Sequence, residues 1–277
     1  MTQRPIVLGL GSLLLAACTH APLPGGEQQR LNDAVRAQPI VLLGEVHDNA
    51  AQHAMRAKAL RALLETGARP ALLMEPFDRE RQADLDRALA QPGITADAVI
   101  AAASPDDASM QGWSWPFYEP YVALAIEYRL PLVAANVSRS DTRRVVKEGL
   151  RSLGFDARVP PDIQAVQAAE IGDNHSGMID AETAARMVGA QVARDQFMAQ
   201  AVEANAGRGA VLIAGNGHVR RDVGVPRWLS QATRARSVSI GLLEAADSTT
   251  GAFDVVLATP APPRVDPCEA MRAPPKR

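Results

Sequence analysis

The stretch VLLGEVHDN, residues 41–49, joins a short apolar run to a cluster of titratable side chains that begins with Glu45. A second stretch, VLIAGNGHV at 211–219, likewise joins a short apolar run to polar side chains. Continuous apolar runs of this length are typical of strands that are covered on both faces. Both stretches place the pattern Gly-x-x-His where the strand is expected to end: Gly44 with His47, and Gly215 with His218.

Apolar runs alternate with segments of helical pattern along the whole chain. Strands are expected at 40–43, 71–74, 132–135, 210–214, 237–242 and 254–257. Helices are expected at 50–65, 79–90, 119–129, 141–153 and 182–204. Short strands that are separated by helices indicate a parallel sheet with helices on both faces. We therefore predict an α/β fold with a mostly parallel sheet, in a single domain at 39–259, and the pattern leaves the strand order open.

Polar side chains follow each of the first four expected strands. In open α/β sheets, sites form outside the carboxyl ends of the strands, so we expect these side chains at one edge. They are Glu45 and His47, then Glu75, then Asn136, and finally Asn216 with His218. Three glycines at these ends would allow a sharp turn or the close approach of a ligand: Gly44, Gly215 and Gly217. The alternative is that the polar residues only cap the next helices, as Asp48 or Asn49 is expected to do.

Large aromatic side chains are concentrated in WSWPFYEPY, residues 113–121. This segment holds Trp113, Trp115, Phe117, Tyr118 and Tyr121 in a chain with few other aromatic residues. Two explanations compete. The aromatic residues can pack the segment onto the domain core. They can instead form a site for a large planar ligand, because haem iron accepts a tyrosine as axial ligand.

The first residues, MTQRPIVLGLGSLLLAAC, have the pattern of a signal peptide, with Arg4 ahead of a short apolar stretch. The ending LAAC resembles the lipobox of bacterial lipoproteins. That resemblance implies cleavage after a signal peptide at 1–17 and acyl chains, such as palmitate, on Cys18. Thr19 after the cysteine implies export to the outer membrane, with the protein facing the periplasm. An ordinary signal peptide that is cut elsewhere is the alternative.

Two flanking segments surround the predicted domain. A Pro- and Gly-containing stretch at 18–38 is expected to be a tether, and His20 lies in it. The Pro-rich stretch at 260–277 is expected to be a disordered tail, with Cys268 as a free thiol. Because Cys18 and Cys268 are the only cysteines and lipidation would consume the first, no internal disulfide is expected. The net charge of −2, with no long run of one sign, argues against a nucleic-acid partner.

Longer segments complete a more specific pattern. They are LLGEVHDN (42–49), LLMEPFDR (72–79), WSWPFYEPYVALA (113–125), LPLVAANVSR (130–139), DNHSGMI (173–179), AQVARDQFMAQAV (190–202) and IAGNGHVRRDVGVPRWL (213–229). In this order and behind a lipobox, they resemble the ChaN-like haem-binding lipoproteins, a family with a cofacial haem-binding domain. The resemblance implies a lipoprotein that binds haem for iron uptake, as a homodimer around two haems, and hence a binding protein rather than an enzyme.

The resemblance also implies roles for individual residues. It assigns the haem iron to Tyr118, with Tyr121 one helical turn away as a second choice, while Tyr128 is expected to serve packing. His175 is the candidate for an assisting histidine from a loop, and His47 for contact with haem. His53 is expected behind the site or on the surface. Candidate partners of the haem propionates are Arg139, Arg143, Arg144, Arg220 and Arg221.

An enzyme remains a second hypothesis. The paired Gly-x-x-His motifs also resemble the sites of TraB-like and erythromycin-esterase-like proteins, which share a related fold. In such a hydrolase, His47 or Glu75 would act as a general base. Otherwise His47, His218 and a glutamate, Glu45 or Glu75, would hold a divalent metal. A third hypothesis is a lipoprotein that only scaffolds partners.

Overall fold

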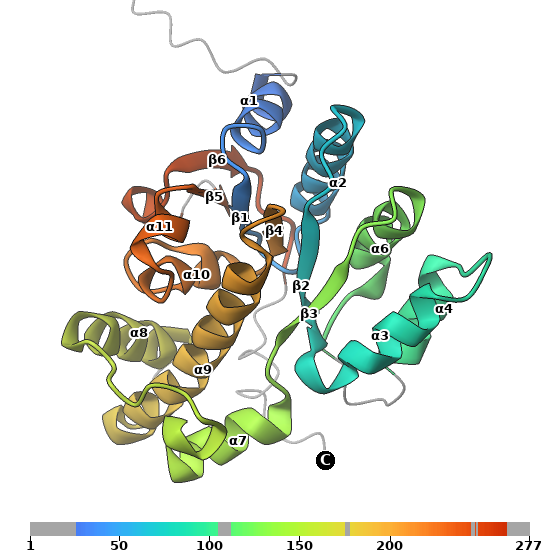
Figure 1. Ribbon diagram of the computed structural model, residues 1–277. Helices are drawn as coiled ribbons and strands as arrows, with labels where there is room; N and C mark the ends of the chain where they lie inside the picture. The colour runs from blue at the N-terminus through green and yellow to red at the C-terminus, as the bar shows by residue number, and fades with distance from the viewer. Residues whose placement is uncertain (1–25, 105–111, 175–177, 245–246, 248, 265–277) are drawn as a thin grey trace, which may run out of the picture.

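Six parallel strands form one open sheet in the order β3-β2-β4-β1-β5-β6, as the computed structural model in Figure 1 shows. The structure describes residues 26–104, 112–174, 178–244, 247 and 249–264. The strands are β1 (Ile40–Leu43), β2 (Ala71–Asp78), β3 (Leu132–Asn136), β4 (Ala210–Ile213), β5 (Ser237–Glu244) and β6 (Val255–Thr259). The predicted α/β fold with a parallel sheet is confirmed.

Helices cover both faces of the sheet (Figure 1). The α-helices are α1 (Gly26–Ala34), α2 (Ala50–Glu65), α3 (Gln82–Leu89), α4 (Ala96–Ala103), α6 (Trp115–Glu127), α7 (Arg139–Glu148), α8 (Pro161–Asn174), α9 (Ala181–Asn205), α10 (Asn216–Val219) and α11 (Gln231–Arg234). Short 3₁₀ turns are η1 (Arg79–Arg81), η2 (Leu150–Leu153), η3 (Val225–Arg227) and η4 (Thr249–Ala252).

The central strand β1 explains why its sequence shows no alternation. Val41 and Leu43 pack into a core with α1, α2, α4 and α6 on one face of the sheet. Ile40 and Leu42 pack into a second core with α9 on the other face. All four side chains are buried. A strand that is covered on both faces needs apolar residues at every position.

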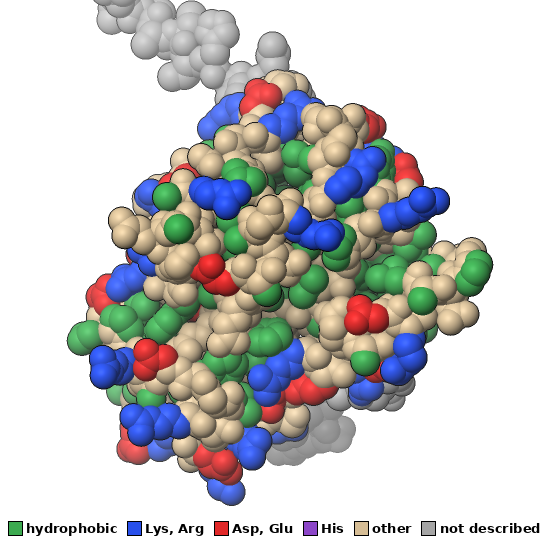
Figure 2. All heavy atoms as spheres, viewed as in Figure 1, with side chains coloured by type: hydrophobic (Ala, Val, Ile, Leu, Met, Phe, Trp, Pro, Cys, Tyr) green, Lys and Arg blue, Asp and Glu red, His purple; other side chains and the backbone are tan. Residues whose placement is uncertain are grey.

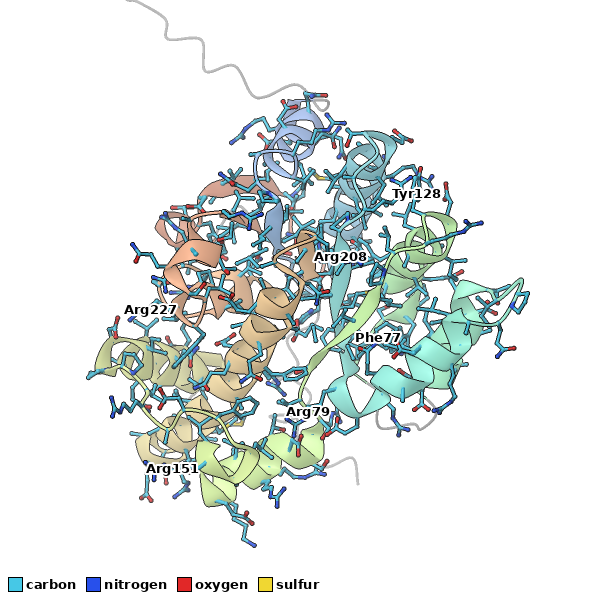
Figure 3. The ribbon with its side chains drawn as sticks, viewed as in Figure 1. Phe77, Arg79, Tyr128, Arg151, Arg208 and Arg227 are labelled. Carbon is cyan, nitrogen blue, oxygen red and sulfur yellow. The ribbon has the colours of Figure 1, made fainter. Side chains whose placement is uncertain are left out.

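Helix α9 connects the sheet to a separate helical core. Met198 and Val202, in its second half, pack against the sheet. Val188 and Val192, in its first half, pack with α7 and α8. Figure 1 shows α9 running from α7 and α8 towards β4. Arg79, labelled in Figure 3, pairs through Nη2 with Oδ2 of Asp141 at 2.6 Å and so ties the end of β2 to α7.

Several helix boundaries differ from the predicted ones. Helix α6 begins at Trp115 rather than at 119, because Pro116 lies in its first turn, where a missing N–H costs no hydrogen bond. The predicted helix 141–153 is divided at Gly149, which has a φ of +83°. Helices α4 and α8 lie in segments where no helix was predicted.

Both predicted flanking segments contain ordered residues. The second half of the predicted tether 18–38 forms α1, because Leu31 buries its side chain in the domain core. At the other end, the Pro260 carbonyl accepts from Nδ2 of Asn49 at 2.9 Å, and Arg264 pairs with Asp48 and Glu244. Thus 260–264 of the predicted tail pack on the domain. The signal peptide with Cys18, His20 and Cys268 lies outside the described residues.

No helix among the described residues is both long and apolar enough to span a membrane. On the face drawn in Figure 2, basic and acidic side chains are interspersed rather than gathered by sign.

Replacing Leu31 by alanine tests whether α1 belongs to the domain. The side chain is fully buried, so its truncation should lower the free energy of unfolding by about 2–5 kcal/mol. Urea denaturation of the purified domain would measure the loss. Gln29→Ala, at an exposed position of the same helix, is the control and should cost less than about 0.5 kcal/mol. Equal stability of the two variants would mean that α1 does not contribute to the core.

Candidate functional site

The loops after β1 and β4 stay in contact beyond the ends of the two strands. The Ala214 amide donates to the Leu43 carbonyl at 3.3 Å, and the Asn216 amide donates to the Glu45 carbonyl at 2.8 Å. From the neighbouring strand β2, Oε2 of Glu75 accepts from the Gly215 amide at 2.8 Å. The predicted convergence of strand-end residues at one edge of the sheet is therefore present.

Two glycines allow this close approach. A Cβ atom on Gly44 would stand 2.2 Å from Oδ1 of Asn216, and one on Gly215 would stand 3.0 Å from the ring of His47. The neighbours are protein side chains, so the need for glycine follows from the packing of the loops themselves. Around Gly217 there is open space.

Glu45 is the centre of the first cluster of polar side chains. It is 2% exposed, and a buried carboxylate requires charged or hydrogen-bonding partners. Arg56 of α2, which is fully buried, forms an ion pair with it. The hydroxyl of Tyr118 donates to Oε1 of Glu45, and Nδ1 of His47 lies 2.8 Å from the same oxygen.

Burial controls the protonation of the neighbouring groups. It raises the pKa of the Tyr118 phenol far above its usual value, although the Arg56 charge opposes this effect. Burial also lowers the pKa of His53 to about 4, so this imidazole is neutral at pH 7. The ring of His53 stacks on Phe117, and its Nε2 donates to the His47 carbonyl at 3.1 Å. His53 therefore lies behind the site and not on the surface.

His47 is the exposed member of the Glu45 cluster. About half of its side chain, 49%, is accessible. In the tautomer that donates from Nδ1 to Glu45, Nε2 offers a lone pair to another partner. The indole of Trp113 meets the His47 ring edge to face, with 4.8 Å between ring centroids. The imidazole is thus oriented by a buried carboxylate and an aromatic wall.

A second cluster centres on His218. Its Nδ1 lies 2.6 Å from Oδ1 of Asp195 in α9, and its Nε2 lies 3.3 Å from Oε1 of Glu75. Asp195 is 1% exposed. Burial favours the neutral imidazole, but the two carboxylates outweigh it and raise the pKa of His218 to about 10. Burial would raise the pKa of Glu75, yet the charge of His218 and the hydrogen bonds hold that pKa far below its usual range.

Two cavities contact the clusters, and a third adjoins them. The arginine-lined cavity, of about 520 Å3, contacts His47, Trp113, Asn136, Arg139, Arg143 and Arg194. The acidic cavity, of about 400 Å3, contacts Glu45, His47, Glu170, Asp195, His218 and Asp247. The helix cavity, of about 430 Å3, lies between α7, α8 and α9 and contacts Val146, Ile171, Met187, Ala190, Arg143 and Arg194. His47 lines the first two cavities, and therefore stands between them.

Most residues of the aromatic segment serve packing. Trp115, Tyr118 and Tyr121 are buried in the core and Phe117 packs against it, as the packing explanation requires. The hydroxyl of Tyr121 donates to the His53 carbonyl at 3.0 Å. Tyr128 lies at the C-terminal end of α6 beside Arg61 and Arg69, where it serves packing (Figure 3).

Tyr118 contacts His47 from the buried side of the site. Its hydroxyl lies 3.3 Å from Nδ1 of His47, and its side chain is 1% exposed. It does not line the arginine-lined cavity. In this conformation the Tyr118 hydroxyl is therefore not exposed to that cavity. The assignment of haem iron to Tyr118 stays a prediction, and His175 lies outside the described residues.

The remaining polar predictions have mixed outcomes. Asn49 is the N-cap of α2 and accepts from the Gln52 amide at 3.2 Å, as predicted. The Asn216 amide group bonds to the backbone of Leu242 in β5 and so has a structural role. Asn136 accepts from the Val137 amide at 2.9 Å and lines the arginine-lined cavity.

Of the five arginines predicted for propionates, only Arg139 and Arg143 line that cavity. Arg144 pairs with Glu148, Arg220 with Glu170 and Asp222, and Arg221 with Asp254.

A metal site is not assembled from the predicted ligands. Within the described residues, no three His, Cys, Asp or Glu side chains are arranged to hold an ion together. The predicted set of His47, His218 and a glutamate is divided between the Glu45 cluster and the His218 cluster.

Two important residues were not singled out from the sequence. Arg56 follows the spacing of Gln52, Leu60 and Leu64 on α2, and Asp195 follows that of Val188 and Val192 on α9. A charged residue on the apolar face of a helix predicts a buried partner. That signal was available for both residues.

The His218 cluster predicts how stability depends on pH. The pKa of His218 is about 10 in the folded protein and 6.5 as the reference value, so its contribution is complete below pH 6.5 and lost as the pH rises to 10. His218→Gln should therefore lower the free energy of unfolding at pH 6 by a few kcal/mol, and by much less above pH 10. Urea denaturation of both proteins across this range measures the difference, and a difference that is constant with pH would contradict the prediction.

Comparison with known proteins relates the fold to solved structures. The ChaN protein of Campylobacter jejuni, whose structure is described as showing cofacial heme binding, is 20% identical, covers 82% of this chain and 90% of its own, and has a TM-score of 0.68. The type III effector HopBA1 is 13% identical over 89% of this chain and 99% of its own, with a TM-score of 0.51. The erythromycin esterase EreC has a TM-score of 0.45 at 14% identity, over 78% of this chain and 72% of its own.

The TM-scores of the first two matches show a shared fold. A comparison with curated protein sequences gave no match. The profile of a family described as haem-binding uptake, Tiki superfamily, ChaN matches residues 31–229. Because that match spans most of the chain, the protein belongs to the ChaN family of haem-binding uptake proteins, and the cofactor of this family is haem.

Proposed function

We propose that this protein binds haem in the arginine-lined cavity, with His47 facing the iron. The observation that carries the proposal is the position of His47. Its Nδ1 is held by the buried Glu45, its ring rests on Trp113, and its half-exposed side chain lines the cavity. A histidine that donates one ring N–H to a carboxylate is a better and more rigid metal ligand through the other nitrogen.

The cavity has the chemistry that haem requires. Its volume of about 520 Å3 lies in the ordinary range for small-molecule and cofactor sites. It combines an imidazole, an indole face and cationic side chains, which suit iron, a flat macrocycle and carboxylates respectively. When bound, haem supplies a ferric centre that accepts a nitrogen or anionic oxygen ligand.

Tyr118 is an alternative iron ligand that the same geometry allows. Its phenol is buried and has a raised pKa, so it must lose a proton before it can act as a phenolate. Glu45 already accepts its hydrogen bond and can receive that proton. In the ground state, however, Tyr118 orients Glu45, and through Glu45 it orients His47.

We also propose that the protein acts as a homodimer on the outer membrane. The support for the dimer is the cofacial heme binding described for ChaN of Campylobacter jejuni, because two haems lying face to face suit a pocket shared by two subunits. The support for the anchor is the lipobox-like LAAC sequence that ends at Cys18. A lipid tether of this kind would place the domain in the periplasm, where it can take part in haem or iron uptake.

A second candidate function is hydrolysis at the acidic cavity. One observation favours it: Glu45 orients His47, as a carboxylate orients the histidine that acts as a general base in many hydrolases. The His218 cluster lies next to it. A histidine held in this way can accept a proton from water. The titration described next separates the two candidates, because only the first requires saturable haem binding.

Titration of the purified domain, without its signal peptide, with haemin tests the proposed function. We expect a saturable shift of the Soret band, and His47→Gln should weaken the affinity at least tenfold because the iron donor is removed. Tyr118→Phe keeps the aromatic packing and should weaken it less. The reverse order of the two variants would make the Tyr118 phenolate the iron ligand. Absence of saturable binding to the wild-type domain would reject the haem-binding function.

Membrane anchoring is tested separately on the full chain expressed in a Gram-negative host. Metabolic labelling with radioactive palmitate should mark the wild-type protein, which should sediment with the outer membrane. Cys18→Ser removes the thiol to which acyl chains attach, so the variant should lose the label and leave this fraction. A variant that keeps both would contradict lipidation at this residue.

A further inference from the structure

Two arginines stand at the boundary between the arginine-lined cavity and the helix cavity. Arg143 of α7 and Arg194 of α9 line both of them. His47 lines the arginine-lined cavity together with the acidic cavity. The arginine-lined cavity therefore adjoins the acidic cavity at His47 and the helix cavity at the two arginines.

Neither arginine has a carboxylate partner in the described part of the chain. Nη1 of Arg194 donates to Oε1 of Gln191 at 3.2 Å, while its Nε is buried and has no hydrogen-bond partner among these residues. Arg143 is exposed, and no ion pair involves it within the described residues. A buried N–H group without a partner is unfavourable unless a ligand supplies an acceptor.

The acidic residues that line the same cavity are already engaged. Glu75 is held by His218 and the Gly215 amide. Glu80 lies 3.7 Å from Arg79 and accepts from the Ser138 hydroxyl. Asp78 also has an interaction partner. The two arginines therefore keep their charge available to an added anion.

The helix cavity strengthens the attraction of the two arginines for an anion. Its apolar wall is formed by Val146, Ile171, Met187 and Ala190, and both arginines contact it. Charges beside apolar surface are screened less than charges in open water. A guanidinium group also matches a carboxylate with two parallel hydrogen bonds, which a surface lysine cannot do.

We propose that Arg143 and Arg194 bind the two carboxylates of a dicarboxylate porphyrin, and so fix which edge of the macrocycle points away from His47. The inference rests on the proposed haem-binding function and adds the orientation of the ligand and its selectivity. The cavity then recognises three parts of one ligand: a metal at His47, a flat apolar body beside Trp113, and a pair of anions at the boundary with the helix cavity. A porphyrin without free carboxylates lacks the third contact.

The test compares haemin with haemin dimethyl ester, in which both carboxylates are esterified. The wild-type domain should bind the ester at least tenfold more weakly than haemin. Arg143→Gln and Arg194→Gln should each weaken haemin binding severalfold, and the double variant should bind haemin and the ester with equal affinity. The Soret maximum of bound haemin should not change in these variants, because the iron donor remains.

Arg144→Gln is the matched control. Arg144 is the neighbour of Arg143 on α7, pairs with Glu148 and does not line the cavity, so its removal should leave both affinities unchanged. Equal binding of haemin and the ester by the wild-type domain would overturn the inference, and this measurement needs no variant. Wild-type affinity for haemin in the double variant would also overturn it. In both cases saturable haemin binding would persist, whereas failure of the proposed function would remove binding by the wild-type domain itself.

Discussion

The ion pair between Glu45 and Arg56 is the interaction on which the geometry of the site depends. Both side chains are buried, and a buried charge is stable only with a close partner of opposite sign. The pair joins the loop after β1 to α2, and the Tyr118 hydroxyl joins α6 to the same carboxylate. Three elements are thereby fixed around one carboxylate, and His47, which also contacts this carboxylate, takes its orientation from it.

The second cluster balances charge in a different way. His218 stands between Glu75 and Asp195, so one imidazolium serves two buried carboxylates. The two clusters meet at Gly215, whose amide donates to Glu75 and whose Cα lies against the ring of His47. The acidic cavity is lined by carboxylates and by no arginine among the described residues, while the arginine-lined cavity has guanidinium groups beside its carboxylates. His47 separates the two environments.

Much of the fold and part of the site could be predicted from the sequence. Continuous apolar runs revealed the strands, and the polar residues after them revealed Glu45, His47 and His218. The strand order could not be predicted, because paired strands such as β1 and β4 are far apart in the sequence and their pairing leaves no local pattern. The residues that hold the site, Arg56 and Asp195, were missed because they lie within helices rather than directly after strands. Helix α1 was missed because Gly25 and Gly26 suggested a linker, although Leu31 packs in the core.

The aromatic segment shows why one stretch of sequence can support two explanations at once. From Trp115 onward the chain is helical, so the side chains at Trp115, Tyr118 and Tyr121 lie on a face that packs into the core. Trp113 precedes the helix: its ring packs edge to face on Tyr118, 5.4 Å between ring centroids, and its indole also lines the cavity beside His47. The aromatic residues within α6 therefore pack into the core, while the one that precedes α6 can contact a ligand. Because Tyr118 lies on the packed face of α6 and Trp113 lies ahead of the helix, the aromatic contact available to a ligand in this conformation is the indole, while the phenol acts through Glu45.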